Sequence, residues 1–105
     1  MNVLTAIPLG RSNARTKREI ADVLGTVPRD VEAEIERLRK SGEAAICSDG
    51  SGYWQPLTAA EYADNVQRRR RRAMSQLVTV RGERRLVRRW EAREAEPLAF
   101  RWDAA

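Results

Sequence analysis

The stretch from Thr16 to Leu38 constrains the fold of this chain most strongly, because its residues specify two short helices and the turn between them. Thr16 and Glu19 have the three-residue spacing of a capping box, so the first helix should start at Thr16. Gly25 follows the last apolar residue of this helix, where glycine can adopt the left-handed conformation that ends a helix. Pro28 fits the first turn of the second helix, where its missing N–H costs no hydrogen bond.

Apolar residues at helical spacing give each of these two helices one buried face. The positions are Ile20, Val23 and Leu24 on the first helix and Val31, Ile35 and Leu38 on the second. Ala21 is small where two crossing helices would approach closely, and Gly25 follows it four residues later. This spacing predicts a helix-turn-helix.

A β-hairpin is predicted directly after the second helix. Asp49-Gly50 separates two short apolar or aromatic runs, 44–48 and 53–56, which is typical of a tight turn between antiparallel strands. Another short helix is predicted near the start of the chain, over residues 3–7. Three helices followed by a hairpin predict a winged helix-turn-helix, a mainly α fold with one small β-hairpin.

Three motifs resemble the winged-helix domain of biotin-operon-repressor-like proteins. They are Ile-Ala-x-x-Leu-Gly at Ile20–Gly25, Val-x-x-x-Ile-x-x-Leu-Arg at Val31–Arg39 and Gly-Tyr-x-x-Pro at Gly52–Pro56. The wider sequence is similar to small winged-helix proteins of bacteriophages and prophages. The resemblance covers residues 3–57 and implies that 27–36 form a DNA-recognition helix and 48–52 the tip of a wing.

The two halves of the chain differ in charge. Residues 1–57 carry equal numbers of basic and acidic side chains, whereas 58–105 carry twelve basic and seven acidic ones, which accounts for the net charge of +5. Attraction to nucleic acid is therefore expected mainly from the second half. We divide the chain into a winged helix-turn-helix domain, 1–57, and an arginine-rich helical extension with an aromatic C-terminal tail, 58–105.

The extension is also predicted to be helical. Thr58 and Glu61 form a second capping box, so a helix should begin at Thr58. The β-branched run at 77–80 and Gly82 predict a bend or break, with a separate helix over 83–96. The aromatic residues Trp90, Phe100 and Trp102 predict either a small satellite core, with the tail docked, or a surface for a homodimer through the C-terminal helices.

The composition excludes most catalytic and metal-binding chemistry. The chain contains no histidine, which removes the usual acid–base and nucleophilic pairs and the commonest metal ligand. Cys47 is the single cysteine, so neither an internal disulfide nor a structural zinc site is possible, and its place on a predicted strand indicates a buried thiol. We therefore expect a protein that is not an enzyme and needs no cofactor or metal.

Neither a membrane anchor nor a secretory leader is indicated, because no apolar run is long enough to cross a bilayer. A cytoplasmic protein is expected.

Duplex DNA is the first candidate partner. Thr26, Arg29 and Ala33 would lie at the groove, and Ser48 and Ser51 of the wing would hold phosphates. Arginines of the extension would add phosphate contacts, namely Arg68, Arg69, Arg72, Arg85 and Arg89. The alternative for these arginines is a solvated helix whose side-chain stems cover apolar surface.

A protein partner is the second candidate, because the exposed positions of the recognition helix are acidic. Asp30, Glu32 and Glu36 accompany Arg29 there, and acidic side chains are costly between two lines of phosphates. The same helix would suit a winged-helix module that inhibits or adapts a host protein.

Overall fold

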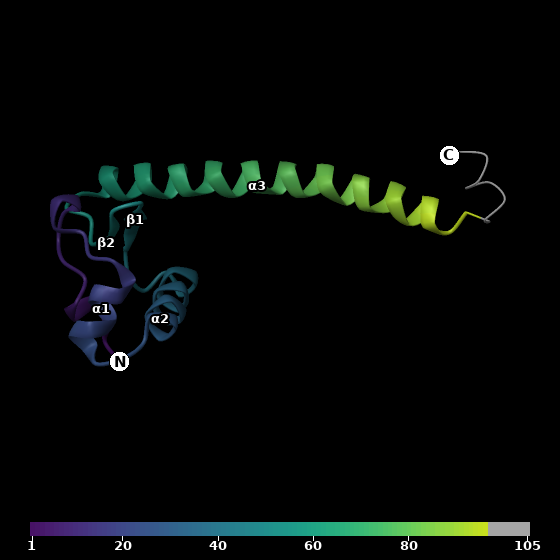
Figure 1. Ribbon diagram of the computed structural model, residues 1–105. Helices are drawn as coiled ribbons and strands as arrows, with labels where there is room; N and C mark the ends of the chain where they lie inside the picture. The colour runs from purple at the N-terminus through teal and green to yellow at the C-terminus, as the bar shows by residue number, and fades with distance from the viewer. Residues whose placement is uncertain (97–105) are drawn as a thin grey trace. The chain divides into compact units, whose positions relative to one another are not determined.

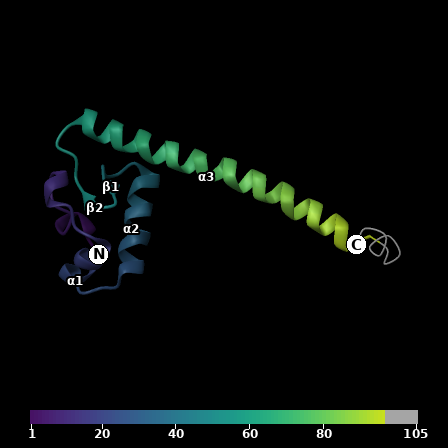
Figure 2. The same ribbon diagram turned by 45° about the horizontal axis from the view of Figure 1, so that its top comes forward.

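The computed structural model describes residues 1–96 and shows a mainly helical chain with one small β-hairpin, as predicted (Figures 1 and 2). The elements in order are the 3-10 helices η1 (Val3–Thr5) and η2 (Arg11–Asn13), the helices α1 (Lys17–Leu24) and α2 (Pro28–Ser41), the strands β1 (Cys47–Asp49) and β2 (Gly52–Trp54), and the helix α3 (Ala59–Glu94). The chain divides into two units, Met1–Arg68 and Arg69–Ala105, so that α3 starts in the first unit and continues in the second.

Helices α1 and α2 are built as the sequence predicts. The Thr16 hydroxyl accepts a hydrogen bond from the Glu19 N–H, and the Glu19 carboxylate accepts one from the Thr16 N–H, which completes the capping box. Gly25 ends α1 in the left-handed conformation, with φ at 67°. Pro28 opens α2, whose C-terminal cap Gly42 is also left-handed.

The core of the first unit lies mainly between η1, α1 and α2. Its buried members are Val3, Ala6, Ile7, Ile20, Ala21, Val31, Ile35, Leu38 and Ile46. Val23 was expected on the buried face of α1 but is 59% exposed. Successive helical residues are about 100° apart, so a face that contains Ile20, Ala21 and Leu24 turns Val23 towards solvent.

The helix predicted over residues 3–7 is wrong in type and length. Only Val3–Thr5 is helical, as one 3-10 turn that the Asn2 side chain caps. The Gln55 side-chain amide donates to the carbonyls of Leu4 and Ile7, and the Gln55 N–H donates to the Pro8 carbonyl. Bonds to the segment that follows β2 therefore replace the helical bonds expected here, and Pro8 has no N–H with which to extend a helix.

Strands β1 and β2 form the predicted antiparallel hairpin. The register pairs Cys47 with Trp54 and Asp49 with Gly52, which leaves residues 50–51 as the turn. The Cys47 thiol is buried as expected, and Trp54 is buried too. Gly52 has a φ of 124° and lies so close to the chain before α1 that a Cβ there would overlap the Arg15 carbonyl.

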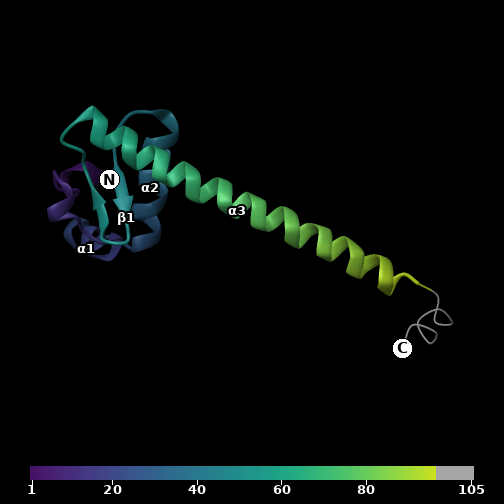
Figure 3. The same ribbon diagram turned by 90° about the horizontal axis from the view of Figure 1, so that it is seen from above.

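The start of α3 lies against the hairpin in the first unit (Figure 3). The Thr58 hydroxyl accepts from the Glu61 N–H, as in the predicted cap, but the Glu61 carboxylate accepts from the Trp54 indole N–H and the Leu57 N–H, both at 2.8 Å. One turn later, Asn65 is only 7% exposed. Its amide donates to the Ser48 carbonyl at 2.9 Å and its oxygen accepts from the Ser48 N–H at 3.2 Å.

In the second unit α3 continues without a break to Glu94, so the predicted interruption near Gly82 and the separate helix over 83–96 are wrong. A glycine inside a helix costs only about 1 kcal/mol relative to alanine, and β-branched residues cost less. No proline interrupts α3, and the hydroxyl of Thr79 donates to the Ser75 carbonyl one turn earlier. The tail with Phe100 and Trp102, which was expected to dock, lies outside the described residues.

We predict that Gly52→Ala lowers the free energy of unfolding by about 2 kcal/mol or more, because the new Cβ would overlap the backbone at Arg15 and the φ would be strained. Chemical denaturation measures the change. Gly50→Ala is the control, since a Cβ at Gly50 meets open space. Equal stability of the two variants would contradict the close approach of the hairpin to the chain before α1.

We also predict that Asn65→Ala lowers the free energy of unfolding by about 2 kcal/mol, because the buried amide loses its hydrogen bonds and the Ser48 backbone groups lose their partners. Gln67→Ala, at an exposed position of the same helix, should have little effect. If thermal melting showed the same midpoint for both variants, the packing of α3 against β1 would not be as described.

Candidate nucleic-acid interface

Helix α2 presents an exposed face that contains the side chains the resemblance assigns to DNA recognition. The exposed positions are Arg29, Asp30, Glu32, Ala33 and Glu36, which are the positions predicted from the sequence. Thr26, in the turn before α2, is half-buried, and its hydroxyl donates to the Asp30 carboxylate at 3.2 Å. Thr26 is therefore engaged by α2, whereas Arg29 and Ala33 are open to solvent.

The two glutamates on this face are each paired with a lysine. Glu32 lies 2.8 Å from the Lys17 ammonium of α1, and Glu36 lies 3.0 Å from Lys40 on the next turn of α2. The hydrogen bond from Lys17 to Glu32, together with the carboxylate charge, raises the pKa of Lys17. Such exposed pairs add little stability, but each places a positive charge beside an acidic one. The face is consequently less acidic than its sequence indicates.

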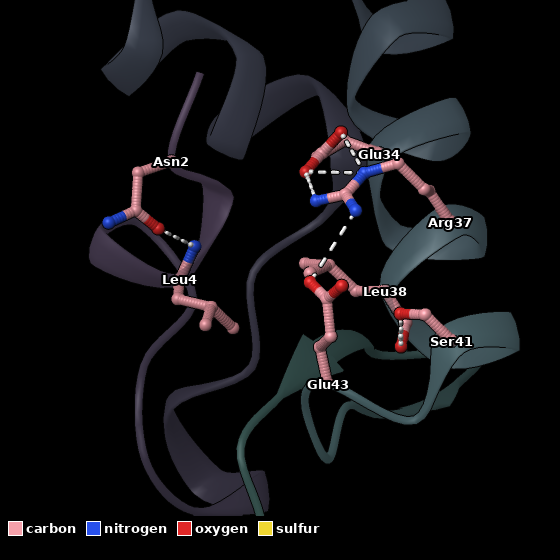
Figure 4. Close-up of polar contacts among 7 residues, drawn as sticks. All are labelled: Asn2, Leu4, Glu34, Arg37, Leu38, Ser41 and Glu43. Carbon is pink, nitrogen blue, oxygen red and sulfur yellow. Dashed lines mark hydrogen bonds and ion pairs between the residues drawn. The ribbon is translucent and has the colours of Figure 1, made fainter.

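A second cluster of paired charges lies near the C-terminal end of α2 (Figure 4). The Arg37 guanidinium lies 2.7 Å from the Glu34 carboxylate and 3.4 Å from Glu43. The hydrogen bond from Arg37 lowers the pKa of Glu34. In the same view, the Ser41 hydroxyl donates to the Leu38 carbonyl at the end of the helix (Figure 4).

Several basic side chains of the first unit hold the fold together. Arg39 donates to the Ile46 carbonyl and to the Ser48 hydroxyl, and its guanidinium carbon lies 5.7 Å from the centre of the Tyr53 ring. Arg15 donates to the Ala6 carbonyl at 2.9 Å. These roles were not predicted, because they join residues that only the folded chain brings together.

Two arginines of the first unit remain available for a ligand. Arg18 and Arg29 are exposed, and within residues 1–96 neither guanidinium has a hydrogen bond or an ion pair. Arg18 was not singled out from the sequence. The sequence feature that could have identified Arg18 is its position in the first turn of α1, between the exposed residues Lys17 and Glu19.

The hairpin turn contributes little positive charge. Ser48 is half-buried between Arg39 and Asn65, so its polar groups are occupied, whereas Ser51 is exposed. Asp49 lies 2.7 Å from the Arg11 guanidinium. Partial burial raises the pKa of Asp49, but hydrogen bonds from Arg11 and from the Ser51 N–H outweigh it and hold that pKa below its usual value.

The second unit carries most of the unpaired positive charge. Exposed arginines without a partner among the described residues are Arg70, Arg71, Arg72, Arg81, Arg84, Arg85, Arg88 and Arg89. They include three of the predicted phosphate contacts, Arg72, Arg85 and Arg89. Because successive residues are about 100° apart, these arginines surround the helix and do not form a single face.

The other two predicted contacts are engaged within the chain. Arg68 belongs to the first unit and pairs with Asp64 at 2.9 Å, and Arg69 is half-buried and makes a contact of its own.

Within residues 1–96, no group of three or more acidic, cysteine or histidine side chains is placed to hold a metal ion. None of the helices in that range has both the length and the apolar character that a bilayer crossing requires.

Comparison with models of protein families, with curated proteins and with solved structures found no match to this chain.

Proposed function

We propose that the chain is a winged helix-turn-helix protein of the bacteriophage or prophage type that binds duplex DNA without a cofactor, as a regulator of transcription or replication. The observation that carries this proposal is the set of eight exposed, unpaired arginines on the second unit of α3. The order of α1, a tight turn, α2 and a hairpin supports the winged-helix assignment.

A polyanion suits this part of α3 better than a partner with a single acidic spot. Residues 69–94 contain ten arginines and three acidic residues, and the arginines point in all directions around the helix. Several are four residues apart, as in Arg84–Arg88 and Arg85–Arg89, where like charges repel and destabilise an isolated helix. Phosphates along a nucleic acid would relieve this repulsion at many positions and release counterions.

Helix α2 would supply the base contacts. Arg29 is exposed and unpaired in its first turn, and arginine can bond both acceptors of a guanine edge in the major groove. Ala33 lies one turn later on the exposed face and is small enough to allow close approach. Lys17 and Lys40 offset the charges of Glu32 and Glu36, so the cost of bringing these acids near phosphates is lowered.

The rival proposal is a winged-helix module that binds a host protein through α2. The exposure of Glu32 and Glu36 favours it, because a basic surface on a partner could replace the two lysines. We rank it second, since it leaves the arginines of α3 without a role.

We predict that Arg85→Gln combined with Arg89→Gln weakens nonspecific DNA binding several-fold and lowers the salt dependence by about 0.9 in the logarithmic slope for each phosphate that the variant no longer neutralises. Titration of the full chain with random-sequence duplex at several salt concentrations measures both effects. The control is Arg11→Gln with Arg37→Gln, which removes the same charge from arginines that are already paired with carboxylates. Equal reductions in DNA affinity for the two variants would indicate that the attraction depends on the net charge of the chain and not on the arginines of α3.

We predict that Glu32→Gln combined with Glu36→Gln strengthens nonspecific DNA binding by about 1 kcal/mol in total, since the change frees Lys17 and Lys40 to meet phosphates. Glu43→Gln, which removes an exposed acid outside this face, should have less effect. If the double variant bound DNA as the original chain does and no longer bound a host-protein partner, α2 would serve the rival function.

A further inference from the structure

Gly82 lies in the middle of α3, where the fold itself does not require a glycine. Its φ is not positive, and a Cβ at this position would meet open space. A glycine inside a helix lowers helical stability relative to alanine. Gly82 is half-buried, whereas the other residues of 70–96 are exposed. What the glycine provides here is therefore space beside the helix backbone.

That space is an open hollow bordered by three arginines. It is lined by Gly82, Arg85, Arg88 and Arg89, and none of these four residues is acidic. Side chains on a helix lean towards its N-terminus, so Arg85 and Arg89, about one and two turns after Gly82, lean back towards it. Within residues 1–96 none of the three guanidinium groups has a hydrogen bond or an ion pair.

We propose that this hollow binds a phosphate group, which the three arginines hold against the helix backbone at Gly82. The inference rests on the proposed function, because the phosphate would belong to the backbone of duplex DNA. A guanidinium group can donate two parallel hydrogen bonds to a phosphate, and glycine allows a ligand to approach the backbone closely. The phosphate would also offset the repulsion between like charges three and four residues apart.

Other arginines of the second unit are less suited to hold a single phosphate. A neighbouring hollow is lined by Arg84, Val87, Arg88 and Glu91, so a carboxylate and an apolar side chain border it. The arginines at 70–72 are consecutive, and their side chains point in directions about 100° apart. The three arginines beside Gly82 are therefore better placed than these to meet at one anion.

Filling the hollow without changing the charge tests the proposal. Gly82→Leu should weaken binding of the full chain to random-sequence duplex several-fold, because the new side chain occupies the space of the phosphate. Ser75→Leu is the matched control, since it adds the same side chain at an exposed position of the helix seven residues earlier and should leave the affinity unchanged. Circular dichroism should show no loss of helix in either variant, because leucine is the better helix former.

A second pair of variants tests the guanidinium geometry at constant charge. Arg85→Lys with Arg88→Lys and Arg89→Lys should weaken duplex binding several-fold, because lysine cannot make the paired hydrogen bonds to one phosphate. The same three changes at the arginines of 70–72 should have little effect. If duplex DNA bound both lysine variants equally well, or bound Gly82→Leu as tightly as Ser75→Leu, the hollow would not be a phosphate site, while the proposed function would stand.

Nuclear magnetic resonance of the full chain separates DNA from a free phosphate ion as the source of the group. Duplex DNA should shift the Nε–H signals of Arg85, Arg88 and Arg89 in a saturable way, with inorganic phosphate acting more weakly and chloride at equal ionic strength not at all. If inorganic phosphate shifted these signals and the duplex did not, the site would stand and the proposed function would fail. If neither shifted them, the site would be overturned.

Discussion

The hydrogen bonds of Ser48 hold three elements of the first unit together, namely α2, β1 and the start of α3. Its hydroxyl accepts a hydrogen bond from Arg39 of α2, and its backbone N–H and carbonyl are both bonded by Asn65 of α3. One residue of β1 thus connects the hairpin to the helix before it and to the helix after it. Because Asn65 is buried, these bonds are expensive to leave unmade, and they fix which side of the hairpin α3 can cover.

How much of this fold follows from the sequence depends on the range of the interactions involved. The capping box at Thr16 and the left-handed Gly25 are set by neighbouring residues, so the ends of α1 were predicted correctly. The segment before Pro8 was predicted as a helix because its apolar spacing is helical, but its carbonyls bond to Gln55, far along the chain. The break predicted at Gly82 is also wrong, although the signal there is local, because a glycine inside a helix costs only about 1 kcal/mol relative to alanine.

The residues of the candidate site also divide into those whose environment follows from local sequence patterns and those whose environment depends on contacts between distant parts of the chain. Exposure of Arg29 and Ala33 could be predicted from helical periodicity, because the buried stripe of α2 is unambiguous. The partner of Glu32 could not, since Lys17 lies on another helix. Ser48 was expected to meet phosphate because it borders the turn, yet the folded chain already uses its polar groups. Some charges and hydroxyls that look available in the sequence, such as those of Glu32 and Ser48, are therefore taken up by tertiary contacts.

If the chain binds DNA as proposed, the unpaired arginines of the second unit would supply affinity and those of the first unit would supply sequence selectivity. In the first unit the exposed, unpaired arginines among the described residues are Arg18 and Arg29, too few for strong attraction to a phosphate backbone. The second unit has eight, but they surround a helix, and contacts from them to phosphates would carry no sequence information. Strong salt-dependent binding would then come from α3 and base discrimination from α2.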